Sequence, residues 1–186
     1  MAYNEQKIEL GAGNLYLYLW SGSTEPTVNE ASTPTDAKDI GGTSGASLMY
    51  KQEVLDIEID QTMSAVESFM IGESGEFKIT VVEQLFTTIA LALGLNPDTE
   101  ILSSPVSGQY VTFGGQKNPL YSRLWYRVPQ IHDTTKYWDV HLYKCMCTSG
   151  AELPFKKKEA RQFELTFKLY PRSSTNKYLG RVYRQA

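Results

Sequence analysis

Apolar and polar residues alternate from Gln162 to Leu169, within the predicted strand 161–170, and this pattern most constrains what the chain can fold into. The apolar members of the series are Phe163, Leu165, Phe167 and Leu169. Because successive side chains of a β-strand point to opposite faces of a sheet, the pattern predicts a strand with one buried face and one polar face.

Five further stretches have strand character, and together they indicate the fold class. They are residues 14–20, 52–60, 76–82, 122–130 and 136–146. The first is apolar on both faces, which predicts cover on both sides. In the second, Leu55 and Ile57 belong to a face that we expect to be buried. So many strands predict a mainly β protein, with a two-sheet antiparallel sandwich or barrel.

One segment, residues 83–93, has the period of a helix. Its apolar face is predicted to consist of Leu85, Phe86, Ile89 and Leu93. Gly94 suits the left-handed position that ends a helix, and Pro97 prevents continuation. A helix this short needs tertiary packing, so we expect it to flank a sheet.

Two segments differ from the predicted strands in composition. Of the 27 residues in 21–47, 16 are Ser, Thr, Gly or Pro, which predicts a long loop. Residues 172–186 carry apolar side chains among basic ones, which predicts an arm that docks on the body. The length of 186 residues suits a single domain, 1–186, with a substantial core.

The net charge of −3 is unevenly distributed along the chain. Residues 1–143 contain 8 Lys and Arg against 18 Asp and Glu, whereas residues 144–186 contain 10 against 3. The basic C-terminal quarter is consistent with nucleic-acid binding, with head-to-tail self-association, or with a solvated basic tail. No stretch approaches the roughly 20 apolar residues of a membrane helix, and no signal peptide is readable.

The sequence offers little that predicts catalysis, a cofactor or a metal. The glycine-rich stretches lack the spacing of a dinucleotide turn and the lysine of a phosphate-binding loop. Asp139, His141, Cys145 and Cys147 share one face of a predicted strand, but His141 to Cys147 alone extend over about 20 Å, too far for one zinc ion. The two cysteines are predicted to be reduced thiols. His132 and Asp133 are predicted to lie in a turn.

Asp56, Glu58 and Asp60 form an acidic face on the second predicted strand. Three carboxylates at a spacing of two are most often a solvated strand face. A hydrolase built on such carboxylates is the least favoured interpretation.

The order of segments from Asp39 to Gly94 carries a resemblance to a known family. A glycine-rich stretch (Gly41-Gly42-Thr43-Ser44-Gly45) precedes the acidic strand, Gly72-Glu73-Ser74-Gly75 precedes strand 76–82, and the helix follows directly. This order resembles that of the tail-tube (major tail) proteins of long-tailed bacteriophages, over about a third of the chain. Type VI secretion tube proteins and phage tail terminators share that fold.

The resemblance implies a non-enzymatic virion protein that forms stacked hexameric rings, the conduit for DNA ejection. Its partners would be copies of itself, a tape-measure protein, and terminator or baseplate proteins, with assembly in the bacterial cytoplasm. DNA would pass without specific binding, since like charges repel the phosphate backbone. The implied lumen residues are Asp56, Glu58 and Asp60. The implied inter-ring loop residues are Thr24, Glu25, Asp36, Lys38 and Asp39.

A second interpretation comes from a different class of protein. The basic C-terminal strands and the aromatic residues of the second half of the chain are compatible with a β-barrel that binds nucleic acid. The acidic pI of about 5.5 argues against it.

Overall fold

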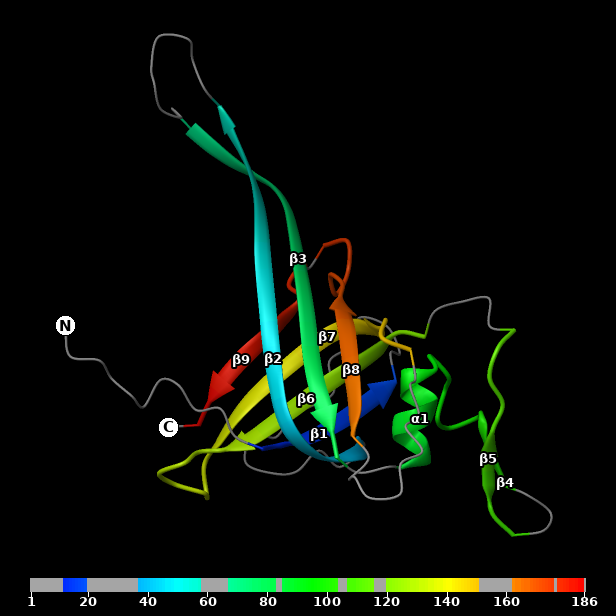
Figure 1. Cartoon of the computed structure of the whole chain (residues 1–186). Helices are drawn as coiled ribbons and strands as arrows, with labels where there is room; N and C mark the ends of the chain where they lie inside the picture. Colours follow the sequence, from blue (N-terminus) through cyan, green and yellow to red (C-terminus); the bar gives the residue numbers. More distant parts are fainter. Residues whose placement is uncertain are drawn as a thin grey trace.

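The computed structural model describes residues 12–19, 37–57, 67–82, 85–103, 107–115, 120–150, 162–175 and 177–185. Strands account for 61% of this part of the chain, which also contains one helix (Figure 1). The prediction of a mainly β, antiparallel fold with one flanking helix is therefore confirmed.

The elements follow one another mostly as hairpins. In chain order they are β1 (Asn14–Leu19), β2 (Lys38–Ile57), β3 (Glu67–Val81), α1 (Phe86–Ala92), β4 (Ile101–Ser103), β5 (Gln109–Val111), β6 (Ser122–Pro129), β7 (Tyr137–Cys147), β8 (Phe163–Leu169) and β9 (Gly180–Arg184).

The large sheet has the order β6-β1-β2-β3-β8-β7-β9, and all of its pairings are antiparallel. β6 also pairs with β7, so the sheet curls round and closes on itself like a barrel. Tyr126 shows this closure, since it lies opposite Leu15 of β1 and opposite Val140 of β7. The second sheet is the small β4–β5 hairpin.

The core lies inside the closed sheet, where the inward-facing residues of its strands meet. β8 supplies Phe163, Leu165, Phe167 and Leu169, all buried, as their alternation predicts. Phe77 packs against both Phe167 and Tyr126, with ring centroids 6.5 and 5.8 Å apart. These aromatic contacts join β3, β6 and β8 into one hydrophobic cluster.

The helix is shorter than predicted and buries a different face. Leu85 and Leu93 occupy the cap positions, and Gly94 adopts the left-handed conformation (φ 71°) that the sequence predicts. The prediction that Leu85 and Phe86 pack inward is wrong, because both are about 40% exposed. Ile89 and Leu93 are half-buried. The buried helix residues are Thr88, Ala90, Leu91 and Ala92. Thr88 fixes this rotation, since its hydroxyl donates to the Ile40 carbonyl.

The predicted loop 21–47 is corrected at its C-terminal end. Lys38 already pairs with Leu17, and β2 continues through the glycine-rich stretch as strand. Lys38 forms an ion pair with Asp98, and Asp39 accepts a hydrogen bond from the Gly41 amide. Both residues therefore belong to a sheet rather than to an inter-ring loop. The remaining loop residues, Thr24, Glu25 and Asp36, lie outside the described residues.

β2 and β3 are far longer than the other strands and extend well beyond the closed body (Figure 1). β1 reaches only to Gly42 on one edge of β2, and β8 reaches only to Glu76 on the outer edge of β3. Beyond these points, within the described residues, the two strands pair only with each other. The hairpin therefore leaves the body as a two-stranded ribbon.

The C-terminal segment docks on the body through β9, which pairs with β7 from Trp138 to Leu142. The turn predicted at His132 and Asp133 is also confirmed. There the Asp133 carboxylate accepts hydrogen bonds from the amide and the hydroxyl of Thr135.

Candidate functional site

The ribbon formed by residues 51–57 of β2 and 67–74 of β3, here called the arm, has the most unusual surface in the described chain. All of its residues are exposed except Gly72, which is half-buried. Its strands lie opposite each other from the pair Lys51–Ser74 to the pair Ile57–Glu67. An isolated two-stranded hairpin is marginally stable in water, so we expect another surface to pack against this ribbon and stabilise it.

Apolar side chains lie on both faces of the arm. A bulge between Glu53 and Val54 shifts the register, so that Val54 faces Met70 and Leu55 faces Phe69. Successive residues of a strand point to opposite sides, so these two pairs lie on opposite faces. The four side chains are 46–60% exposed. An apolar band thus surrounds the ribbon instead of lining one side.

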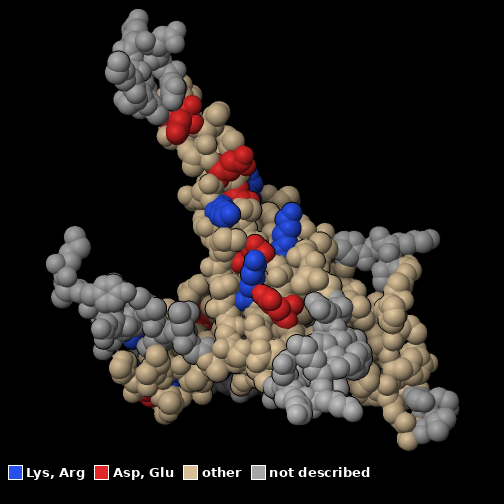
Figure 2. Space-filling model, viewed as in Figure 1, with Lys and Arg blue, Asp and Glu red and all other residues tan. Residues whose placement is uncertain are grey.

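Acidic residues accompany the apolar band. The charged residues of the arm are Lys51, Glu53, Asp56, Glu67 and Glu73. Figure 2 shows red side chains along the projecting ribbon. Asp56 accepts a hydrogen bond of 2.6 Å from the Ser68 hydroxyl across the ladder. Glu73 accepts one of 2.9 Å from the Tyr50 hydroxyl. These local bonds hold the carboxylates in place along the ribbon.

Only one residue of the predicted acidic face belongs to the part of the chain that the structure describes. Asp56 is exposed on the arm, whereas Glu58 and Asp60 lie outside the described residues. Leu55 and Ile57, expected to be buried, are 53% and 43% exposed. The alternation correctly separated the two kinds of residue, but the described residues leave the apolar ones uncovered.

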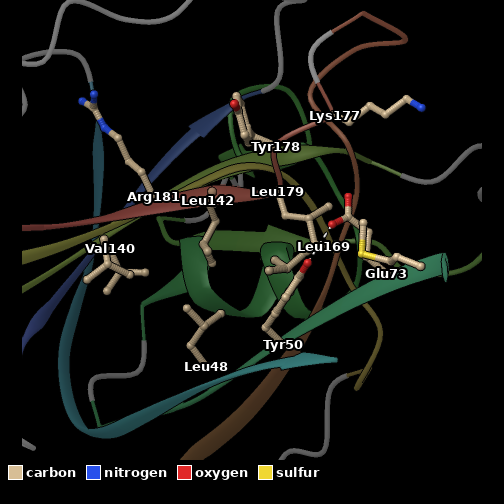
Figure 3. A pocket seen from close by; sticks show the side chains of 13 residues that line it. Leu48, Tyr50, Glu73, Val140, Leu142, Leu169, Lys177, Tyr178, Leu179 and Arg181 are labelled. Carbon is tan, nitrogen blue, oxygen red and sulfur yellow. Dashed lines mark hydrogen bonds between the residues drawn. The ribbon is translucent and has the colours of Figure 1, made fainter. Parts of the chain in front are cut away.

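A groove of about 460 Å³ lies where the arm leaves the body (Figure 3). The hairpin contributes Leu48, Tyr50, Met70 and Glu73 to its wall. The opposite wall comes from β7, β8 and the C-terminal segment, with Val140, Leu142, Leu169, Leu179 and Val182. Its centre is apolar, and Lys177 and Arg181 carry their charges outward from it. A cleft of this size and polarity is typical of a binding surface.

A buried polar cluster lies on the outer side of β6 and β7. The Arg127 guanidinium bonds both carboxylate oxygens of Asp139, at 2.7 and 3.0 Å. The indole N–H of Trp125 donates to the same carboxylate at 2.8 Å. The guanidinium also lies 4.7 Å from the ring centres of Trp125 and Tyr137. Trp125 and Arg127 belong to β6 and Asp139 belongs to β7, so these bonds hold the two strands together.

His141 completes this cluster. Its ring stacks on Trp125 with centroids 4.6 Å apart. Burial, together with the positive charges of Arg181, Arg127 and Arg123, lowers the pKa of His141 to about 4, although Asp139 opposes this. The imidazole is therefore neutral at physiological pH, and its Nε2 has no hydrogen-bond partner among the described residues.

Asp139, His141, Cys145 and Cys147, which share one strand face, do not form a metal site. Asp139 is committed to Arg127, and Cys145 is buried with its thiol donating to the Ser122 carbonyl. Burial raises the pKa of both Cys145 and Cys147, and both are free thiols, as predicted. Within the described part of the chain, no group of three His, Cys, Asp or Glu side chains could hold a metal ion.

No protein-family model matches the chain, and no curated protein matches its sequence. In the described residues, no helix is long and apolar enough to cross a membrane. The function must therefore be inferred from the arm and the groove themselves.

Sequence reasoning missed the arm, although two signals for it were present. Val54 and Leu55 are adjacent apolar residues, and so are Phe69, Met70 and Ile71. Adjacent apolar residues in a strand indicate two covered faces. The groove, by contrast, joins residues from five strands and has no local signal.

Proposed function

We propose that this protein is a non-catalytic structural subunit that assembles with copies of itself through the arm. The observation that carries the proposal is that two exposed apolar cross-strand pairs, Leu55–Phe69 and Val54–Met70, lie on opposite faces of a ribbon that no other described strand supports. Removing these half-exposed side chains from water contributes on the order of 1 kcal/mol each. A partner on each face would stabilise a ribbon that is marginal alone.

The edges of the arm support the same proposal. Beyond Gly42 on β2 and Glu76 on β3, each strand presents an outer edge without a strand partner among the described residues. Long open edges promote strand pairing with other chains, and closed assemblies remove them. A contact between two different surfaces of identical subunits generates rings or filaments.

The specific assembly that we propose is a bacteriophage tail tube of stacked hexameric rings. Its support is the resemblance of the segment order, the closed β-fold with a flanking helix, and the acidic arm. In this proposal Asp56, with Glu58 and Asp60, faces the lumen and repels passing DNA. The partners are a tape-measure protein and terminator or baseplate proteins, and the protein resides in the virion tail after assembly in the bacterial cytoplasm.

Light scattering coupled to size-exclusion chromatography, followed by negative-stain microscopy, tests this proposal. We expect hollow rings or tubes whose abundance rises with protein concentration. A monodisperse monomer at every concentration would contradict self-assembly. Solid fibres without a central channel would contradict the tube while preserving self-assembly.

Nucleic-acid binding is a second proposal, favoured by one observation. Lys144 lies 4.2 Å from the ring centre of Tyr121, which contacts Tyr170 edge-on at 5.4 Å. Basic and aromatic groups in this combination bind single strands by stacking and charge attraction. Titration of a labelled oligonucleotide, followed by fluorescence anisotropy at several salt concentrations, tests it. Weak binding with no salt dependence would exclude this function.

A further inference from the structure

The two faces of the arm are in different situations within one subunit. Tyr50 and Met70 line the groove of their own chain, so the face that carries them is turned toward that groove. Leu55, Ile57 and Phe69 lie on the other face, because they alternate with Val54 and Met70 along their strands. This outer face is exposed, and none of its three apolar residues lines the groove.

The groove has the features that would receive such a face. Its walls are apolar, and its volume of about 460 Å³ is open to the surface between the hairpin and β9 (Figure 3). Val182, on its β9 wall, is 56% exposed. Both the groove and the outer face of the arm therefore present exposed apolar side chains that a contact between them would bury.

The charges around the two surfaces are mostly opposite in sign, although Glu73 lies on the hairpin wall of the groove and Lys51 shares the outer face of the arm. On the outer face, Glu53 and Glu67 flank Leu55 and Ile57. The described residues 177–185 next to the groove contain Lys177, Arg181 and Arg184 and no acidic residue. Opposite charges at the rim of an apolar contact guide orientation and suppress wrong pairings.

We propose that the groove of one copy binds the outer face of the arm of a second copy. Leu55 and Phe69 enter the groove, and Glu53 and Glu67 meet Lys177 and Arg181 of the other copy. This inference rests on the proposed self-assembly and names the two surfaces that make it. Because arm and groove are different surfaces, each subunit both gives an arm and receives one, which extends the assembly from copy to copy.

Two variants separate the partners of this contact. The arm variant, Leu55→Lys with Phe69→Lys, places positive charges opposite the basic rim. The groove variant, Lys177→Glu with Val182→Glu, places negative charges opposite the acidic arm. All four positions are exposed, so both variants should keep the wild-type circular dichroism spectrum and melting temperature. Phe113→Lys, at a position 80% exposed beyond β5, is the matched control and should assemble normally.

Light scattering on the separate and mixed variants provides the decisive measurement. Each variant alone should remain a monomer where the wild type assembles. A mixture should associate, because the arm variant keeps its groove and the groove variant keeps its arm, and the introduced lysines and glutamates attract each other where the two altered surfaces meet. Normal assembly of the groove variant, assembly failure of the control, or a mixture that stays monomeric would overturn the inference.

A wild-type protein that never assembles would instead overturn the proposed function, and this inference with it. A combined reversal within one chain gives a further readout. Glu53→Lys with Glu67→Lys should abolish assembly, and adding Lys177→Glu with Arg181→Glu should restore it. Absence of this rescue would show that the charges do not meet across the contact.

Discussion

Leu55 of β2 lies directly opposite Phe69 of β3, in a part of the hairpin where neither strand has another strand partner among the described residues. About half of each side chain is exposed. An aromatic–aliphatic cross-strand pair stabilises a sheet by less than about 1 kcal/mol, which is too little to maintain a ribbon of this length. The pair therefore makes sense as part of a contact surface rather than as a device for stabilising the monomer.

Removing the arm should abolish assembly without unfolding the body. Tyr50 and Gly75 lie opposite each other, so residues 51–74 can be replaced by Asn-Gly, which favours a two-residue hairpin turn. In the described part of the chain, the deleted strand residues pair only among themselves, so the melting temperature should change by only a few degrees. Calorimetry and light scattering check both results. Loss of cooperative melting would show that the arm stabilises the fold itself.

The strands of the body could be predicted because their burial is decided within the chain. Phe163, Leu165 and Phe167 alternate with polar residues, and the closed sheet buries them as expected. Leu55 and Ile57 show the same alternation, yet both are exposed in the part of the chain that the structure describes. Periodicity identifies the face that seeks cover, but it cannot tell whether the cover comes from the same chain.

Long-range pairings explain the other differences. Local spacing groups Asp139 with His141 and Cys145, because the three share a strand face. Its actual ion-pair partner is Arg127, which lies opposite it in the β6–β7 register. The helix rotation depends on a contact between Thr88 and Ile40, far apart in sequence. Neither contact can be predicted from the spacing of residues along a single strand or helix.

The rotation of α1 can be tested by comparing two alanine substitutions. Leu91 is almost completely buried in the core, so Leu91→Ala should lower the unfolding free energy by about 2–5 kcal/mol. Phe86 is 39% exposed, so Phe86→Ala should cost under about 1 kcal/mol. Urea unfolding measures both. The reverse order would mean that the helix buries its Leu85–Phe86 side.

The buried Arg127–Asp139 pair should be costly to break from one side. Asp139→Ala leaves a buried guanidinium without its carboxylate, and it should lower the unfolding free energy by about 3–5 kcal/mol. Replacing both members, with Arg127→Met and Asp139→Leu, removes the uncompensated charge and should cost less than the single change. If the double variant were less stable than Asp139→Ala, the pair would not be the dominant interaction of this cluster.

The neutral His141 predicts a defined dependence of stability on pH. Its folded pKa of about 4 is below the ordinary value of 6.5. Between these values the unfolded chain binds a proton that the folded protein does not bind, so acidification favours unfolding. The unfolding free energy should fall as the pH drops from about 6.5 to about 4, by at most about 3 kcal/mol, and this contribution should level off below pH 4.

His141→Phe is the matched test of this dependence, because phenylalanine can preserve the stacking on Trp125 but cannot take up a proton. The variant should lose most of the decline between pH 6.5 and 4 while keeping comparable stability at pH 7. Urea unfolding at half-unit pH intervals measures both proteins under the same conditions. Parallel curves for the two would show that other groups, and not the imidazole beside Trp125 and Arg181, control acid stability in this range.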